Sequence, residues 1–177
     1  MPKVTKSNTN LLLKYINKHP LNHELIIDII NNGCDINETN DDNVSILNLY
    51  INSFKSINCG KSDKINIEIV KLLTPDNINS QCKKGYTILH AVCKICPNRL
   101  DIIKYLVEEC DIDITIKNSF NNTGLDLIPI NSFGNNSSAN YLKNQMKLKK
   151  NKLRSINNKI EKLLAEKEKL LADENEC

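Results

Sequence analysis

The feature that most limits what this chain can fold into is a short pattern that recurs along it. A threonine or serine stands two residues before a leucine at Thr9, Ser45, Thr87 and Thr123, so the steps are 36, 42 and 36 residues. The apolar residues that follow fall at helical spacing, in segments too short to be stable helices in water. Such units must stack, because each one buries its apolar face only against a neighbour of the same kind.

The spacing predicts pairs of short helices joined by polar loops. We expect helices over residues 9–17 and 22–32, then over 44–53 and 65–73, and a third pair between Gly85 and Ile116 with Thr87 as a helix cap. Gly33 and the prolines are expected to end helices. A polar insertion at residues 54–64 explains the longer middle step, and Pro129 cuts off a fourth unit that starts at Thr123.

The third unit carries a recognisable motif. Gly85, Thr87, Leu89, His90 and Ala91 resemble the Thr-Pro-Leu-His-x-Ala signature of ankyrin repeats, whose period is about 33 residues. The resemblance implies an all-α fold, an α-solenoid of about three and a half ankyrin-like repeats over residues 8–129, with residues 1–7 frayed. It also implies that His90 forms a hydrogen bond across the turn near Thr87. The second repeat departs from the pattern, because asparagine replaces both the family's glycine and its histidine.

The resemblance also implies a function. Ankyrin-like stacks bind protein partners through the loops between helix pairs, here called fingers, and through the inner face of the first helices. The expected fingers are residues 38–43, 81–84 and 115–122. The first finger is acidic and the second is basic, so we expect a partner to be recognised by its charge pattern. Nine residues are the predicted partner-binding set: Asn40, Asp41, Asp42, Lys83, Lys84, Tyr86, Lys117, Asn118 and Phe120.

A different pattern begins after an Asn-, Ser- and Gly-rich linker at residues 130–139. Residues 140–173 place apolar side chains at alternating steps of three and four, which predicts a coiled-coil helix. From Lys143 to Lys159 there are seven basic residues and no acidic one, whereas acids outnumber bases from Glu161 to Glu176. We therefore predict a weak antiparallel homodimer, or packing against an acidic helix. The predicted contact residues are Leu142, Met146, Leu153, Ile156, Ile160, Leu163 and Leu170.

Two alternatives compete with protein binding. The basic run from Lys147 to Arg154 is an alternative nuclear-import or nucleic-acid patch, although it lacks interleaved aromatic residues. Cys93 and Cys96, with Cys82 and His90, are an alternative zinc site, although a second Cys-x-x-Cys motif is missing. Nucleic-acid binding and metal binding are the less favoured interpretations, and no cofactor is expected.

Composition and missing motifs limit the classes of function and the cellular locations that we expect. The sequence holds no glycine-rich phosphate loop, nucleophile elbow or Ser/His/Asp arrangement, so we expect no enzyme. Its seven cysteines, without a signal-like or membrane-spanning segment, favour an intracellular protein with reduced thiols, in the cytoplasm or the nucleus. Low aromatic content (5%) and asparagine-rich turns resemble the ankyrin-repeat proteins of large DNA viruses, which implies a viral or host-interacting adaptor in host cytoplasm. A protist or an intracellular bacterium is the alternative source.

Overall fold

The computed structural model describes residues 6–18, 20–55, 65–129 and 136–175, and side chains as far as residue 168. The chain divides into two compact units, residues 1–139 and residues 140–177, which are described separately. Most of the predicted insertion (56–64) and of the predicted linker (130–135) lies outside the described residues, as do residues 1–5 of the expected frayed end.

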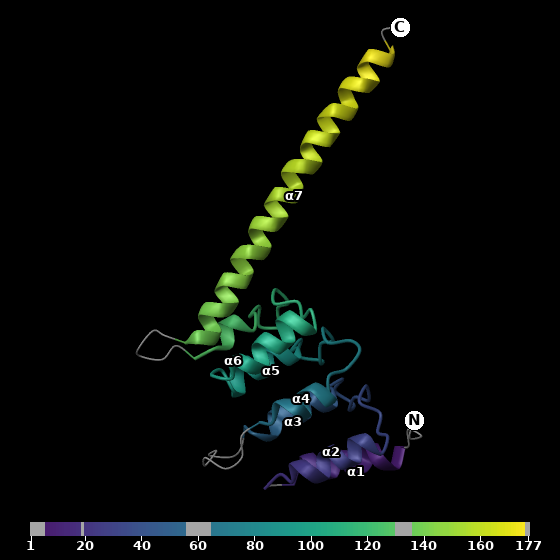
Figure 1. The fold of residues 1–177 in the computed structure, drawn as a ribbon, viewed down its shortest axis with the longest axis vertical. Helices are drawn as coiled ribbons and strands as arrows, with labels where there is room; N and C mark the ends of the chain where they lie inside the picture. Colours follow the sequence, from purple (N-terminus) through teal and green to yellow (C-terminus); the bar gives the residue numbers. More distant parts are fainter. Residues whose placement is uncertain (1–5, 19, 56–64, 130–135, 176–177) are drawn as a thin grey trace. The chain divides into compact units, whose positions relative to one another are not determined.

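The first unit consists of short helices (Figure 1). In chain order they are α1 (Lys6–Ile16), α2 (His23–Asn31), α3 (Ile46–Ser53), α4 (Ile67–Leu72), α5 (Ile88–Ile95) and α6 (Leu100–Lys104). A π-helical turn, η1 (Tyr105–Glu109), continues α6, and a 3-10 turn, η2 (Leu125–Leu127), is all that forms of the fourth repeat. Only an isolated bridge between Thr39 and Ser45 resembles β-structure in the described ranges, so the predicted all-α repeat fold is confirmed.

The helices stack in two rows. The first helices of the repeats contact one another in the order α1, α3, α5 and η2, and the second helices in the order α2, α4, α6. Figure 1 shows the pairs α1–α2, α3–α4 and α5–α6 as successive layers of the first unit. This arrangement follows from the repeat pattern, because each pair covers the apolar face of the next.

Local sequence fixes where these helices start and stop. Asn22, Ser45 and Asn66 cap α2, α3 and α4, each with its side-chain oxygen accepting a backbone N–H of the first turn. Gly33 ends α2 with a φ of 88°, a conformation that costs glycine little. Both kinds of signal were visible in the sequence.

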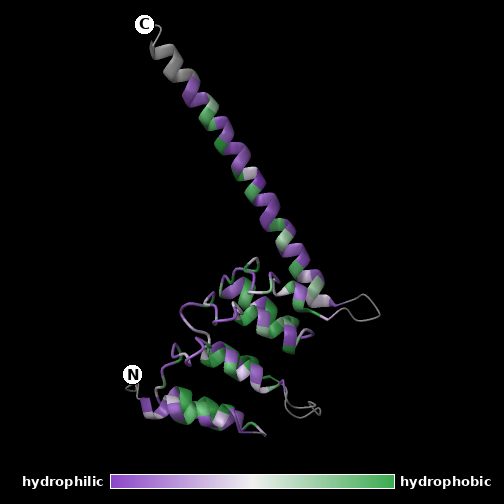
Figure 2. Cartoon of the chain, turned by 180° about the vertical axis from the view of Figure 1, so that it is seen from behind, coloured by the Kyte–Doolittle hydropathy of each residue, from purple (hydrophilic) through white to green (hydrophobic). Residues whose placement is uncertain are grey.

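The core is a thin apolar layer between the two rows. Leu12, Ile26, Leu47, Ile69 and Leu89 are all 2% exposed or less, and each such burial contributes roughly 1.5–3 kcal/mol. In Figure 2 the short helices of the first unit carry contiguous hydrophobic stretches among hydrophilic residues, whereas α7 shows isolated hydrophobic residues among hydrophilic ones. The stack therefore relies on many aliphatic contacts along its length.

Some predicted details of the first unit differ in the structure. Helix α1 starts at Lys6, so residues 6 and 7 are helical where we expected fraying. Phe54, placed at the start of the insertion, is 4% exposed and packs edge-on against Tyr50 at 5.4 Å. These errors arise because burial depends on which helix lies opposite.

The second unit is a single helix. Helix α7 runs from Ser137 to Asn175, and Asn136 caps its start by accepting the N–H groups of Ser138 and Ala139. The last residues of the predicted linker, 137–139, therefore belong to the first turn of this helix. None of the described helices is long and apolar enough to cross a lipid bilayer.

Candidate functional site

The tips of the three fingers share one backbone conformation. Asn43, Gly85 and Asn121 occupy the same place in successive repeats and have φ values of 59°, 74° and 64°. Asparagine is among the few residues that adopt this left-handed conformation readily. The second repeat therefore keeps the turn geometry although it lacks the family's glycine.

Hydrogen bonds tie each finger to the next. The amide of Asn43 donates to the carbonyl of Gln81 at 2.8 Å, and the N–H of Lys83 donates to the carbonyl of Asp42 at 3.0 Å. One finger further on, the N–H of Ser119 donates to the carbonyl of Lys84 at 3.1 Å. The fingers thus form a connected row whose geometry is set before any partner arrives.

His90 anchors the third finger from inside the stack. The backbone N–H of Thr87 donates to Nδ1 of His90 at 3.1 Å, which confirms the predicted bond across the turn. Since Nδ1 accepts, the neutral ring carries its proton on Nε2, which lies 2.9 Å from the carbonyl oxygen of Asn122. Burial lowers the pKa of His90 below its ordinary value, although the bond to Asn122 and the charge of Asp126 oppose the shift.

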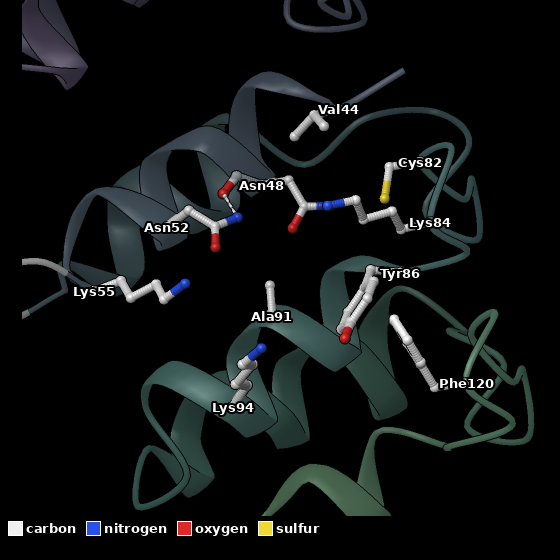
Figure 3. A pocket seen from close by; sticks show the side chains of 10 residues that line it. All are labelled: Val44, Asn48, Asn52, Lys55, Cys82, Lys84, Tyr86, Ala91, Lys94 and Phe120. Atoms are coloured by element: carbon white, nitrogen blue, oxygen red, sulfur yellow. Dashed lines mark hydrogen bonds between the residues drawn. The ribbon is translucent and has the colours of Figure 1, made fainter. Parts of the chain in front are cut away.

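A groove of about 410 Å³ lies between α3 and α5, beside the second and third fingers. Figure 3 shows Asn48 and Asn52 of α3 on one side of this α3–α5 groove, and Ala91 and Lys94 of α5 on the other. The remaining lining residues are Val44, Lys55, Cys82, Lys84, Tyr86 and Phe120. The groove is thus open, with polar and apolar groups on the inner face of the first helices.

Two aromatic rings form the finger end of the groove. The rings of Tyr86 and Phe120 meet edge-on with centroids 6.4 Å apart, and Phe120 is 66% exposed. Tyr86 also packs edge-on against His90, and the ammonium group of Lys94 lies 5.5 Å from the Tyr86 ring centre. Phe120 therefore offers a large apolar surface at a site that its neighbours hold in place.

The predicted partner-binding residues do not all lie at one site in the structure. Lys84, Tyr86 and Phe120 come together in the α3–α5 groove, and the other six predicted residues do not line it. Asp42 and Lys83 form an exposed ion pair at 3.3 Å, a type of contact that contributes little to stability.

The other predicted finger residues lie outside the α3–α5 groove. Asn40 stabilises the turn of the first finger, because its side-chain oxygen accepts the backbone N–H groups of Asp42 and Val44. The ammonium group of Lys117 donates to the side chain of Asn121 at 3.0 Å, and Asp41 is exposed. Asn118 is only 5% exposed, and its side-chain oxygen accepts the N–H groups of Phe120 and Asn122. It therefore shapes the third finger from within.

The prediction missed the helix side of the groove. Asn48, Asn52 and Lys94 line it but were not among the predicted residues. The repeat alignment held the signal, because Asn52 and Lys94 occupy the same place in successive repeats, one helical turn after Asn48 and His90. Side chains one turn apart share a face, so both repeats direct these positions to the inner surface.

The predicted contact residues of α7 differ in their exposure. Leu153, Ile156, Ile160 and Leu163 are 44–64% exposed, although all four are large and apolar. Leu142 is buried and Met146 is half-buried, and the side chain of Leu170 lies outside those that the structure describes. An unpartnered apolar stripe therefore runs along the middle of α7.

Cys93 and Cys96 lie in a protected environment. Cys93 is fully buried, and burial raises the pKa of each thiol to about 12. Zinc binding and disulfide exchange both require thiolates, so this environment opposes them. Both ring nitrogens of His90 are occupied by Thr87 and Asn122. Among the described residues no three His, Cys, Asp or Glu side chains gather in a way that could hold a metal ion.

The fold is that of a helical repeat protein, because it consists of stacked helix pairs joined by similar finger turns, with a buried histidine in the third repeat. Comparison with family models gives the particular family: residues 13–118 match the model for ankyrin repeats in three copies. The chain belongs to the ankyrin-repeat family, as its third repeat predicted. No curated protein matches the chain. Ankyrin repeats generally mediate protein–protein interactions, and no catalytic family is indicated.

Proposed function

We propose that this protein is a non-enzymatic adaptor whose repeat unit holds a protein partner in the α3–α5 groove and against the fingers. The observation that carries the proposal is the pair Tyr86 and Phe120. An aromatic side chain that is 66% exposed beside a groove is the usual form of an interface anchor. The hydrogen-bonded row of fingers supports the same conclusion, because a pre-organised surface loses less entropy on binding.

Affinity capture with matched variants tests this function. The wild-type chain, Phe120→Ala and Leu11→Ala are each used to capture proteins from a host-cell lysate. Leu11 is 39% exposed on α1 and does not line the groove, so its substitution removes apolar surface of a similar kind elsewhere. We expect a protein that wild type and Leu11→Ala retain and that Phe120→Ala loses. Equal retention by all three variants would move the binding site away from the groove.

We propose further that α7 pairs with α7 of a second copy in antiparallel orientation. The exposed stripe of Leu153, Ile156, Ile160 and Leu163 supports pairing of some kind. The charge asymmetry supports the orientation, because the basic half of one helix then faces the acidic half of the other. Self-association would present two repeat units and so raise the avidity for a partner that has two matching sites.

The cellular setting is part of the proposal. We propose that the adaptor acts inside a cell, in the cytoplasm of a host if its source is viral. The support comes from the sequence: seven cysteines and an asparagine-rich, aromatic-poor composition. A fluorescent fusion of the full chain, imaged in eukaryotic cells, tests this proposal. Cytoplasmic signal is expected, and nuclear accumulation that needs Lys147 to Arg154 would favour the nuclear-import alternative instead.

A further inference from the structure

Two grooves of opposite charge lie side by side on the inner face of the repeat unit. Of the described residues, Lys55, Lys84 and Lys94 line the α3–α5 groove and no acidic residue does. A second groove of about 240 Å³ lies between α1 and α3 beside the first finger, and Glu38 and Asp41 are its only charged lining residues in the part of the chain that the structure describes. Because α3 lines both, a bound segment that crosses α3 meets positive charge on one side and negative charge on the other.

The charged residues of the two grooves form no ion pairs with other described residues. Asp42 and Lys83, their neighbours in the fingers, neutralise each other at 3.3 Å. Among the described residues, Lys55, Lys84 and Lys94 have no ion-pair partner, nor do Glu38 and Asp41. Lys94 does contact the Tyr86 ring, at 5.5 Å, which holds its ammonium group at the groove. The five charges therefore remain available to a partner.

Building on the proposed function, we propose that the partner presents a segment of mixed charge in a fixed direction. Its acidic residues lie in the α3–α5 groove among the lysines, with a large apolar side chain against Tyr86 and Phe120. Its basic residues lie in the α1–α3 groove near Glu38 and Asp41. Packed helices are about 8–10 Å apart and an extended chain advances about 3.3 Å per residue, so about three residues separate the two parts.

The same arrangement favours a peptide over a nucleic acid. A nucleic-acid strand is negatively charged along its whole length, so it would be repelled where it passed Glu38 and Asp41. Asn52, which is exposed in the α3–α5 groove, presents a side-chain oxygen that suits the N–H groups of a peptide backbone, while its amide nitrogen donates to the carbonyl of Asn48 at 2.7 Å. A peptide with both charges satisfies each groove.

Selection from a random 12-residue peptide library on the immobilised full-length protein tests the inference. We expect retained peptides to carry an acidic cluster and a basic residue about three residues apart, next to an aromatic or large aliphatic residue. The best peptide is then synthesised together with a version in which acidic and basic residues are exchanged. Their affinities are compared by fluorescence anisotropy, at low and high salt.

Charge-reversed proteins complete the test. The double variant Lys84→Glu and Lys94→Glu should weaken the selected peptide by about tenfold or more, because two attractive contacts become repulsive. Lys14→Glu, which reverses an exposed lysine of α1 outside the α3–α5 groove, should change affinity less than about twofold. A quadruple variant that adds Glu38→Lys and Asp41→Lys should prefer the charge-exchanged peptide. Helix content and the melting temperature confirm that each variant is folded.

The outcomes separate this inference from the function on which it rests. Retained peptides with no charge pattern, still lost by Phe120→Ala, would overturn the charge inference and leave groove binding standing. Peptides of the expected pattern that bind the double variant as well as wild type would also overturn it. If the library yields no peptide that the groove residues affect, the proposed function itself fails.

Discussion

Nε2 of His90 lies 2.9 Å from the carbonyl oxygen of Asn122, which follows it by 32 residues in the chain. The same ring accepts the backbone N–H of Thr87 through Nδ1, so one side chain joins the start of α5 to the third finger. Phe120 stands two residues before Asn122 in that finger. The histidine therefore supports the exposed aromatic side chain through buried hydrogen bonds.

Replacing this histidine should loosen both ends of the connection. We expect His90→Asn to lower the free energy of unfolding by about 1–3 kcal/mol, because the Asn122 carbonyl and the Thr87 N–H lose a buried partner. Urea denaturation followed by circular dichroism measures the change. Asparagine is the substitution of choice because Asn48 occupies the equivalent place in the second repeat, so the fold accommodates a side chain of this size there. An unchanged unfolding midpoint would show that the ring is dispensable.

The lowered pKa of His90 makes stability depend on pH. The unfolded state takes up a proton near the ordinary pKa of 6.5, whereas the folded state resists protonation until a lower pH. Stability is therefore full above about pH 6.5 and falls as the pH is lowered through that value towards the folded pKa. The pKa values of Asp101 and Asp126 are lowered from 3.8, so the stability they add is lost only in stronger acid.

The comparison of wild type with His90→Asn isolates this effect. Denaturation midpoints measured from pH 7.5 to pH 5 should fall more steeply for wild type than for the variant. The other histidines are shared by both proteins, so they cancel in the difference. Parallel curves for the two proteins would contradict the assignment of a neutral, buried ring.

Gly85 should tolerate no side chain. Its φ is 74°, and an added Cβ would lie 2.8 Å from the backbone nitrogen of Ser119 and 3.0 Å from Cα of Asn118. We expect Gly85→Ala to destabilise the fold by about 1–3 kcal/mol, since neither backbone atom can move without disturbing the third finger. Asn43→Gly is the matched control at the equivalent turn, with φ 59°. It relieves strain there but also removes the bond to Gln81, so we expect a smaller change.

The thiols of Cys93, which is buried, and Cys96, which is half-buried, should react slowly. With pKa values raised to about 12, Cys93 and Cys96 are almost entirely protonated at pH 8. We expect iodoacetamide to modify them at least about tenfold more slowly in the folded protein than in urea. Peptide mass spectrometry measures each rate separately. Modification of Cys93 at the same rate under both conditions would mean that this part of the stack opens readily.

The stripe on α7 should decide self-association. We expect the wild type to show a concentration-dependent dimer in sedimentation experiments, and Ile156→Glu to remain monomeric because it places a charge within the apolar contact. Ser155→Glu adds the same charge at an exposed position beside the stripe and should leave the dimer intact. A wild-type chain that stays monomeric at high concentration would exclude pairing through α7.

Cross-linking tests the orientation of the pair. In an antiparallel pair centred on the stripe, Leu153 of one helix lies near Leu163 of the other, so mixed Leu153→Cys and Leu163→Cys chains should form a disulfide with each other. A parallel pair would instead favour cross-links between identical chains.

The nucleic-acid alternative has its own test. If Lys147 to Arg154 bind duplex DNA with a steep salt dependence, that result would support the alternative.

Several features of the fold could be predicted because they depend on local chemistry. The cap at Thr87 and the stop at Gly33 are local signals, and apolar spacing located the paired helices. The predicted partner-binding set included Tyr86 and Phe120 of the α3–α5 groove but did not include Asn52 and Lys94, which also line it. Those two residues matter because α3 and α5 lie side by side, which no local signal specifies.

The sequence by itself determined the repeat, the family and the identity of the charges, because a repeating pattern of apolar residues has one economical way to be buried. Only the tertiary structure decided which charges face which groove. Asp41 and Asp42 are neighbours in the chain, yet one lines the α1–α3 groove and the other pairs with Lys83. Their roles differ because stacking brings residues that are distant in the chain within a few ångströms, and electrostatic interactions at that range depend on distance and exposure.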